Sequence, residues 1–485
     1  MSLLDPALWS GKANVGGWTA PTGGTAPVTE PATGEVLDVI GVTTPEDVVT
    51  AAERAARAQT AWARAPYTDR AAVLRRAGDL FTRHADEIRQ WLVREAGSVS
   101  GKAAFETTTA AQECYEAAAL ASRPLGEVLP TAEPRLSLAR RVPAGVVGVI
   151  APFNVPLVLG IRSVAPALAL GNTVLLKPDL RTAVSGGVAI MRVFEEAGLP
   201  ADVLHLLPGG ADTGAALVAA PQVRVISFTG STAAGRKVGA AAAEHLKRAH
   251  LELGGNSALI VLPDADLDRA VSTAAWGSFF HQGQVCMTTG RHLVHASIAG
   301  EYVERLAHKA EHLRVGNPAK EAVALGPVID SGQRDKIHGL VTASVDGGAR
   351  LAAGGTYEDL FYRPTVLTDV TDASPAYAEE VFGPVAPVRT FTELDHAVSL
   401  ATATPYGLSL GILTSDVMRG LDLAERIPTG LVHINDQTVN DEAVAPFGGV
   451  AASGTGARFG GAANIEAFTE TRWITARASQ APYPF

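Results

Sequence analysis

Short apolar runs alternate with helical segments from residue 145 onward, and this alternation restricts the chain to few folds. The first three runs read as buried strands, each followed by a segment of helical spacing; the strands are 145–150, 173–177 and 223–228, and the helices 156–170, 185–197 and 231–243. Strands connected through helices form a parallel sheet with helices on both faces. A second alternating stretch starts at 258–262 and runs to about residue 435. We therefore predict two α/β domains.

Bulk properties narrow the class of protein. A chain of 485 residues is too long for one ordinary domain, and 47% hydrophobic with 19% charged residues allows a large buried core. A formal net charge of −10 argues against nucleic acid as a partner, because phosphate contacts need a basic surface. No apolar run is long enough to span a membrane, and the N-terminus lacks a signal-peptide pattern. We expect a cytoplasmic protein with no membrane partner.

Three segments lie outside the alternation. Residues 1–45 are rich in Gly, Pro and Thr and read as an ordered or partly ordered arm. Residues 46–65 and 68–97 have helical spacing with one apolar face. The last segment, 465–485, is aromatic and β-like, and we expect it to pair elsewhere, for example with another subunit.

The chain has only two cysteines, Cys114 and Cys286. They provide no zinc-type spacing and no disulfide framework, so we expect no metal site and a reducing compartment. Cys286 lies in FFHQGQVCMTTG, after an apolar helical run and a polar turn. Such a thiol is either a nucleophile in a cleft or a buried structural cysteine, and the local sequence leaves both open. Cys114 lies in an Ala-rich helical stretch and is expected to be a bystander.

Three further motifs carry groups that a reaction can use. Glu252 precedes a Gly-Gly turn in LELGGNS and is either a general base or a surface carboxylate. Asn154 follows the first strand in APFNVP, where its amide either holds an oxyanion or occupies an ordinary turn. Ser231 opens a helix in SFTGSTAAG and either helps to bind phosphate or acts as an N-cap.

As a set, these motifs are far more specific than any one of them. FTGS, ELGG, GQ-x-C, LLKP, EEVFGP and PFGG all occur in this chain, which resembles the aldehyde dehydrogenase superfamily from about residue 25 to 475. The resemblance implies a Rossmann-like cofactor domain, an α/β catalytic domain and a small β oligomerisation arm, in a homodimer or homotetramer. The implied ranges are 1–124 and 146–251 for the NAD(P)-binding domain, 252–435 for the catalytic domain, 125–145 and 465–485 for the arm, and 436–464 for a loop lining the substrate entrance.

The resemblance also implies a role for each catalytic residue. Cys286 is then the nucleophile that forms a thiohemiacetal and, after hydride transfer, a thioester. The Asn154 side chain and the Cys286 backbone N–H hold the oxyanion, and one such donor is worth about 10²–10³ in rate. Glu252 activates the water that hydrolyses the thioester and helps to deprotonate the thiol.

The implied cofactor is NAD or NADP. Lys177 resembles the lysine that binds the adenosine ribose, Gly230 and Ser231 the pyrophosphate site, and Glu380 the ligand of the nicotinamide ribose. Phe382 is expected to pack beside the nicotinamide or simply in the core. Pro152 and Phe153 are the other two residues assigned to the cofactor site.

Two positions depart from the pattern of the superfamily. Many NAD-preferring relatives have a glutamate three residues after the lysine, where this chain has Leu180 followed by Arg181. The barrier to NADP is then missing, and Arg181 either favours a 2′-phosphate or is solvated, so both cofactors are compatible. Many relatives also have an Arg-Glu pair where this chain has Ala457 and Arg458, so Glu252 is expected to act without that second glutamate.

The expected substrate is an aromatic aldehyde. An aromatic ring needs an apolar tunnel, and the candidate lining residues are Val155, Val158, Arg162, Phe280, Val285, Met287 and Phe447. Arg162 would repel a cationic substrate; it either contacts a ring hydroxyl or a carboxylate, or forms a structural ion pair. WSGK, RSVAPALALGN and KPDLRTAVSGG resemble the benzaldehyde, salicylaldehyde and vanillin dehydrogenase branch.

Three alternatives differ in substrate or in class. An aliphatic aldehyde or a carboxylated semialdehyde would keep the chemistry, and the semialdehyde would need Arg162 as its anchor. A CoA-acylating enzyme often lacks the glutamate that Glu252 supplies. A non-catalytic binding or structural member would be expected to have lost Cys286 or Glu252, and both are present.

Overall fold

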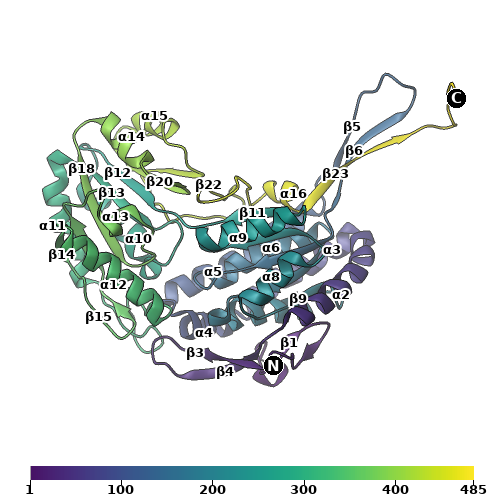
Figure 1. Ribbon diagram of the computed structural model, residues 1–485, viewed down its shortest axis with the longest axis horizontal. Coiled ribbons are helices and arrows are strands. Elements are labelled where there is room, and N and C mark those ends of the chain that lie inside the picture. Colours follow the sequence, from purple (N-terminus) through teal and green to yellow (C-terminus); the bar gives the residue numbers. More distant parts are fainter. Residues whose placement is uncertain (1) are drawn as a thin grey trace.

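A computed structural model describes residues 2–485 and contains two seven-stranded sheets and a projecting three-stranded arm (Figure 1). The first sheet has the order β11-β10-β7-β8-β9-β1-β2. Five of its strands are parallel, and the short β1 and β2 add an antiparallel edge. Their bounds are β1 (Ala13–Asn14), β2 (Trp18–Thr19), β7 (Val146–Ile150), β8 (Thr173–Lys177), β9 (Leu204–Leu206), β10 (Val223–Thr229) and β11 (Arg248–Glu252). The three predicted strands lie within one residue of their observed ends.

Helices cover both faces of this sheet because its strands are apolar on both sides. Val147 and Val149 point into one hydrophobic cluster and Val146 into another, as the two-residue period of a strand requires. The helices that pack in this domain are α2 (Pro45–Arg64), α3 (Tyr67–Arg83), α4 (Ala85–Ala96), α5 (Ser100–Leu120), α6 (Pro156–Ala169), α7 (Ala189–Glu196), α8 (Ala211–Ala219) and α9 (Thr232–Glu244).

Two predicted helices differ from the structure. The segment 68–97 forms α3 and α4 rather than one helix, because His84 leaves the helical conformation with a ψ of 19°. The segment 185–197 begins with a π-helical turn at Val184–Val188 before α7. Glu95 accepts hydrogen bonds from the backbone N–H groups of Val184 and Ser185, at 2.9 and 2.7 Å, and so holds this wider turn.

The second sheet has the order β14-β17-β18-β13-β12-β20-β21 and is parallel except for the pair β14–β17. Its strands are β12 (Ser257–Val261), β13 (Thr289–His295), β14 (Arg350–Ala353), β17 (Thr365–Thr368), β18 (Val385–Phe391), β20 (Ser409–Leu413) and β21 (Leu431–Ile434). The helices on its faces are α10 (Leu267–Phe279), α11 (Ala296–His312), α12 (Ser331–Asp346), α14 (Leu394–Thr402) and α15 (Val417–Glu425). The two sheets occupy the ranges expected for the cofactor and catalytic domains, whose functional assignment stays a prediction.

The third sheet joins segments that are far apart in sequence. Strand β6 (Leu136–Pro143) pairs antiparallel with β5 (Gly126–Val128) and with β23 (Thr469–Ala476), and Figure 1 shows this arm extending away from the body. The sequence predicts β structure from residue 465, but the chain there first forms the helix α16 (Ala463–Phe468), whose Phe468 is buried. Among residues 2–485, no helix is both long and apolar enough to cross a membrane.

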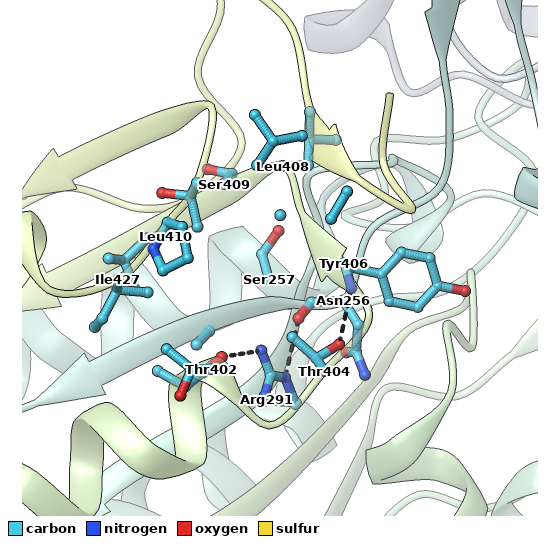
Figure 2. A pocket seen from close by; sticks show the side chains of 17 residues that line it. Asn256, Ser257, Arg291, Thr402, Thr404, Tyr406, Leu408, Ser409, Leu410 and Ile427 are labelled. Carbon is cyan, nitrogen blue, oxygen red and sulfur yellow. Dashed lines mark hydrogen bonds between the residues drawn. The ribbon is translucent and has the colours of Figure 1, made fainter. Parts of the chain in front are cut away.

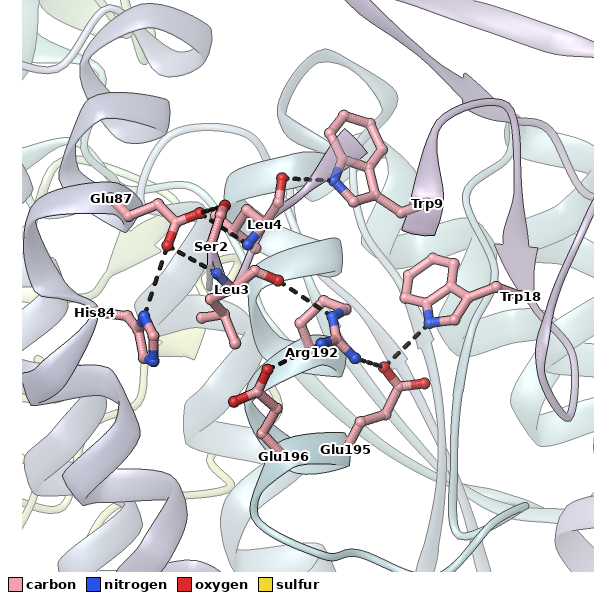
Figure 3. Close-up of polar contacts among 10 residues, drawn as sticks. All are labelled: Ser2, Leu3, Leu4, Trp9, Trp18, His84, Glu87, Arg192, Glu195 and Glu196. Atoms are coloured by element: carbon pink, nitrogen blue, oxygen red, sulfur yellow. Dashed lines mark hydrogen bonds and ion pairs between the residues drawn. The ribbon is translucent and has the colours of Figure 1, made fainter. Parts of the chain in front are cut away.

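The N-terminal segment is ordered and docked on the first domain (Figure 3). The Glu87 carboxylate accepts hydrogen bonds from the backbone N–H groups of Leu3 and Leu4, at 3.0 and 2.8 Å. Arg192 donates to the Leu3 carbonyl at 3.2 Å. Trp9 is 0% exposed, donates its indole N–H to the Leu4 carbonyl at 3.0 Å and packs edge-to-face on Trp91. The segment is therefore part of the core, not a loose arm.

We predict that Trp9→Ala lowers the free energy of unfolding by about 3–5 kcal/mol, because it leaves a large cavity and an unpaired carbonyl. The adjacent Leu8 is 39% exposed, so Leu8→Ala should change stability by no more than about 0.5 kcal/mol. Urea denaturation of the two variants and the wild type measures this difference. Equal losses for both variants would show that the segment is not docked as described.

Candidate active site

The chain passes from one sheet to the other through a short connection. Strand β11 ends at Glu252 and β12 begins at Ser257, so residues 253–256 span the junction of the two domains. A Cβ on Gly255 would lie 2.5 Å from the Cys286 carbonyl oxygen, and one on Gly254 would lie 2.3 Å from a Glu380 carboxylate oxygen. The two glycines therefore allow the approach that brings Glu252, Cys286 and Glu380 to one place.

A buried arginine fixes the far end of this connection (Figure 2). Arg291 donates to the Asn256 carbonyl at 3.0 Å and to the carbonyls of Leu400 and Ala401. The Asn256 amide donates to the Tyr377 carbonyl at 2.9 Å. A cavity of about 120 Å³ lies beside this network, and none of the predicted site residues lines it. We therefore assign a structural role to this network, which holds the connection between the two sheets in place.

The loop that carries Cys286 is held on several sides. It follows α10 and places His281 and Gln282 in the left-handed conformation, with φ of 50° and 57°. The Gln282 amide donates to the carbonyls of Gly97 and Pro327, at 3.1 and 2.7 Å. The Gln284 side-chain oxygen accepts from Ile329 N–H at 3.1 Å. These contacts determine where the thiol points.

Cys286 lies in the wall of a cavity of about 310 Å³. All seven predicted substrate residues line this cavity; they are Val155, Val158, Arg162, Phe280, Val285, Met287 and Phe447. Sequence reasoning missed several others, including Phe105, Leu159, Trp276, Val439, Asn440 and Asp441. Trp276 stacks on Phe280, with ring centroids 4.6 Å apart. The signal in the sequence is the spacing of Trp276 and Phe280, which are four residues apart and so lie on one side of a helix.

Asn154 lies at the end of β7 and is buried in the same wall. Its side-chain amide donates to the Gln284 carbonyl at 2.8 Å, which ties it to the cysteine loop. An amide carries two N–H groups, so the second remains available for a substrate oxygen. Asn154 and Cys286 thus lie close together although they belong to separate domains. An oxyanion site requires such a pair of neighbouring donors.

The Cys286 thiol is neutral at ordinary pH. Burial, with added repulsion from the carboxylates of Glu380 and Glu252, raises its pKa to about 12. Arg162 acts in the opposite direction but does not compensate. Because the thiolate is the nucleophile, a base must take the proton when the thiol reacts.

The pKa of the Glu252 carboxyl group is higher than that of an exposed glutamate. Its side chain is buried, and burial raises the pKa to about 8 despite a hydrogen bond from Gly449 N–H to one carboxylate oxygen at 3.1 Å. The other oxygen has no hydrogen-bond partner in the described part of the chain. Arg458, which stands where many relatives have a glutamate, lowers this pKa. Such a carboxyl group can both accept and release a proton near neutral pH.

Arg162 forms the ion pair that was one of its two predicted roles. It pairs with Asp441 and lies 3.9 Å from Glu113. Its guanidinium also lies 4.5 Å from the centre of the Phe447 ring. The arginine therefore contributes to the cavity wall, but its charge is balanced by protein carboxylates.

The predicted cofactor residues gather at the carboxyl ends of the first sheet. Ser231 caps α9 and accepts from Ala234 N–H at 3.3 Å. Lys177, at the end of β8, is 9% exposed, and its amine contacts only the Pro178 carbonyl, at 3.5 Å. No carboxylate lies within ion-pair distance of this amine in the chain as described. A helix N-terminus and a buried amine without an acid partner fit a pyrophosphate and a ribose.

Glu380 and Phe382 belong to the second domain and contact, respectively, the connection between the sheets and Phe153 of the first domain. Glu380 accepts from Gly255 N–H at 2.9 Å, and burial raises its pKa. Phe382 has a φ of 55° and packs edge-to-face on Phe153, with centroids 5.9 Å apart. Pro152 is partly exposed next to Phe153. The residues present therefore fit a dinucleotide bound between the domains.

Arg181 is exposed to solvent, as one of its two interpretations expected, but it is not a free cation for a 2′-phosphate. It lies between Asp179 and Asp330, at 2.8 and 2.7 Å, and stacks 4.2 Å above Phe153. The structure therefore agrees with a solvent-exposed Arg181 and gives no support to an Arg181 that favours a 2′-phosphate. Within residues 2–485, no group of three or more His, Cys, Asp and Glu side chains is placed to hold a metal ion.

Comparison with known proteins gives concordant matches. The model of the aldehyde dehydrogenase family matches residues 18–474. A vanillin dehydrogenase from an Amycolatopsis species is 70% identical over 486 residues, covering 100% of each chain. A benzaldehyde dehydrogenase (NAD+) from Pseudomonas putida is 50% identical, covering 99% of this chain and 98% of the relative. The crystal structure of a salicylaldehyde dehydrogenase from Pseudomonas putida G7 in complex with salicylaldehyde is 36% identical and covers 98% of this chain and 99% of its own, with a TM-score of 0.94.

The pKa of Glu252 leads to a prediction about stability. The folded state raises it from 4.5 to about 8, so folding favours the protonated form. This contribution is complete below about pH 4.5 and is lost as the pH rises through about 8. Glu252→Gln does not titrate, so its stability relative to the wild type should increase between about pH 5 and pH 8, as measured by the thermal midpoint.

Glu87 provides the control for this measurement, because its pKa is lowered. Over the same pH range it is ionised in both states, so Glu87→Gln should differ from the wild type by a constant amount. A constant difference for Glu252→Gln as well would mean that Glu252 is not buried as described.

Proposed function

The chain belongs to the aldehyde dehydrogenase family, and we propose that it oxidises an aromatic aldehyde to the carboxylic acid with NAD or NADP. The observation that carries the proposal is the cavity of about 310 Å³ at Cys286, whose walls are mainly aromatic and aliphatic. An apolar cavity of this size suits one substituted ring. The named activities of the vanillin and benzaldehyde dehydrogenase relatives agree with this choice.

The first step is attack by the Cys286 sulfur on the aldehyde carbon. A carbon–sulfur bond forms, the carbonyl π pair moves to oxygen, and the thiol proton passes to ionised Glu252. The Asn154 amide and the Cys286 backbone N–H stabilise the oxyanion, each contributing about 10²–10³ in rate. The apolar walls exclude water and strengthen these interactions.

The second step converts the tetrahedral carbon to a thioester by loss of hydride. When bound, the nicotinamide cofactor supplies the hydride acceptor, and Lys177, Ser231, Glu380 and Phe382 would hold it. Glu252, after passing the thiol proton to solvent, takes a proton from water, whose oxygen attacks the thioester. The carbon–sulfur bond breaks, the acid leaves, and the Cys286 thiolate takes the proton back from Glu252. One aldehyde, one water and one oxidised cofactor thus give one acid, one reduced cofactor and one proton.

We further propose that both NAD and NADP are used. Leu180 offers no carboxylate that would repel a 2′-phosphate, and Arg181 is held by Asp179 and Asp330 and does not attract one. The relative with NAD+ in its name supports the use of that cofactor.

The alternative of a carboxylated semialdehyde finds no support in the cavity. Its distal carboxylate would need a free cation, and the Arg162 charge is balanced by Asp441. Glu252, whose charge raises the pKa of Cys286, argues against a CoA-acylating enzyme, since it would activate water to hydrolyse the thioester. Cys286 and Asn154 in the wall of one cavity, with Glu252 near the thiol, argue against a non-catalytic role.

We predict that reduced cofactor forms fastest with aromatic aldehydes. Benzaldehyde and vanillin should give higher kcat/KM than succinic semialdehyde or hexanal, with either NAD or NADP, as measured by absorbance. Cys286→Ala should lose at least about 10³-fold in kcat because the nucleophile is removed. Cys114→Ala is the control, since Cys114 is buried in α5 and lines none of the cavities described above.

Either of two results would contradict the proposal. A higher kcat/KM for hexanal or succinic semialdehyde would reject the aromatic substrate, and turnover by Cys286→Ala would reject the thioester.

We also propose that the chain works in the cytoplasm as a homodimer or homotetramer assembled through its arm. Strands β5 and β23 are the two edges of the arm sheet, and an unpaired edge readily adds a strand. Val128 and Trp473 are 74% and 64% exposed on these strands, so both edges of the arm carry large apolar side chains that a partner strand could cover.

We predict a mass in light scattering of two or four chains. The double variant Val128→Lys and Trp473→Lys should shift it toward one chain, because the charges would be buried in the interface. Met418→Lys, 72% exposed on α15, is the control and should leave the mass unchanged. A wild type that scatters as one chain, or a double variant of unchanged mass, would contradict the proposal.

A further inference from the structure

A fully buried ion pair lies beside the proposed oxyanion site. Lys102 and Glu106 are one turn apart on α5, pair with each other, and are 1% and 0% exposed. Removing two charges from water costs several kcal/mol per ion, and apolar residues often replace such pairs without loss of stability. A pair of this kind is therefore a candidate for a role beyond stability.

Each proton of the Lys102 ammonium has an acceptor. One hydrogen bond goes to Glu106, one to the Ser98 hydroxyl at 3.0 Å, and one to the backbone carbonyl of Asn154 at 2.7 Å. Lys102 also lines the cavity that contains Cys286. Because its three donors are used within the protein, it holds the Asn154 peptide and has none left for a substrate oxygen.

Glu106 holds the next part of the same turn. Its second oxygen accepts from Leu157 N–H at 3.0 Å, in the first turn of α6. The N-cap residue of α6 is Val155, whose side chain cannot cap the helix. Glu106 therefore supplies from α5 the acceptor that a polar N-cap would supply locally.

Asn154 is thus held directly at its backbone carbonyl and its side chain, and indirectly through the helix that follows it. Lys102 binds its carbonyl, Glu106 binds the helix that follows it, and Gln284 accepts from its amide at 2.8 Å. An oxyanion donor is effective only when its N–H is aimed in advance at the place where charge develops.

We propose that Lys102 and Glu106 are positioning residues that aim the Asn154 amide at the substrate oxygen. They act through the peptide that they bind and do not contact the substrate. The inference rests on the proposed function, because it concerns the oxyanion of that reaction.

The test removes the contact without leaving a buried charge. In the double variant Lys102→Met and Glu106→Gln, the methionine has no donor for the Asn154 carbonyl, and the glutamine oxygen can still accept from Leu157. The variant is compared with the wild type, with Asn154→Ala and with the triple variant, using benzaldehyde and NAD. Ser98→Ala is the matched control, since it removes another contact of Lys102 and leaves the one to Asn154.

We expect kcat of the double variant to fall by about 10-fold or more with little change in KM, because the donor matters most in the transition state. Asn154→Ala should lose about 10²–10³-fold. The triple variant should be no slower than Asn154→Ala, because residues that act through Asn154 have nothing left to position. Ser98→Ala should stay within about 2-fold of the wild type.

Two kinetic results would overturn the inference. If the losses multiply in the triple variant, the pair acts on the substrate directly or through general damage. If the double variant has the kcat of the wild type, Asn154 needs no support from α5.

A crystal structure of the double variant gives a second readout that needs no turnover. The inference predicts that the hydrogen bond from the Asn154 amide to Gln284 is lost or that the Asn154 peptide has moved. An unchanged Asn154 would overturn it. A wild type that oxidises no aldehyde would refute the proposed function, and this structural result would still decide the position of Asn154. If the double variant does not fold, Glu106→Gln alone, which weakens the hold on Lys102 and keeps its charge, is measured in the same cycle.

Discussion

The connection between Glu252 and Ser257 is the constraint on which the rest of the site depends. It is the place where the chain leaves the carboxyl end of β11 in one sheet and enters the amino end of β12 in the other. Cys286 and Glu380, which precede β13 and β18, lie next to this connection. The approach is possible because Gly254 and Gly255 have no side chain; a Cβ on either would meet Glu380 or the Cys286 backbone at less than 3 Å. Longer side chains here would push the domains apart and separate the base from the thiol.

Several charged side chains are buried around this junction, and they have different roles. Glu252 is poorly solvated and keeps its proton to higher pH, which suits a group that accepts and returns protons. Arg162 and Asp441 neutralise each other in the cavity wall, so the surface offered to a substrate stays effectively apolar. Lys102 and Glu106 form hydrogen bonds to the backbone at and after Asn154. Because these charges are poorly solvated, a small displacement of any of them raises the free energy of the folded protein. This favours a rigid site.

The sequence predicted what local patterns encode. Apolar runs located β7, β8 and β10, and the residues next to Asn154 and Cys286 were correctly placed in one cavity because they are close in the chain to those two groups. The chemical roles came from the resemblance to a family, since a lone Cys or Glu has no distinctive local pattern. Phe105, Lys102 and Asp441 were missed because their importance arises from contacts across more than fifty residues, which no local period records. The wide turn held by Glu95 was missed for the same reason, since Glu95 lies 89 residues before Val184.

The resting state of Cys286 has a consequence for how long the protein stays intact. Peroxide and alkylating agents react with thiolates, and a thiol with a pKa of about 12 is almost entirely protonated at neutral pH. The Cys286 thiol therefore reacts slowly with these reagents until an aldehyde is bound and a base takes its proton. A thiol that ionises only when a base takes its proton resists conversion to sulfenic acid. The burial that makes the thiol a slow nucleophile at rest therefore also extends its chemical lifetime.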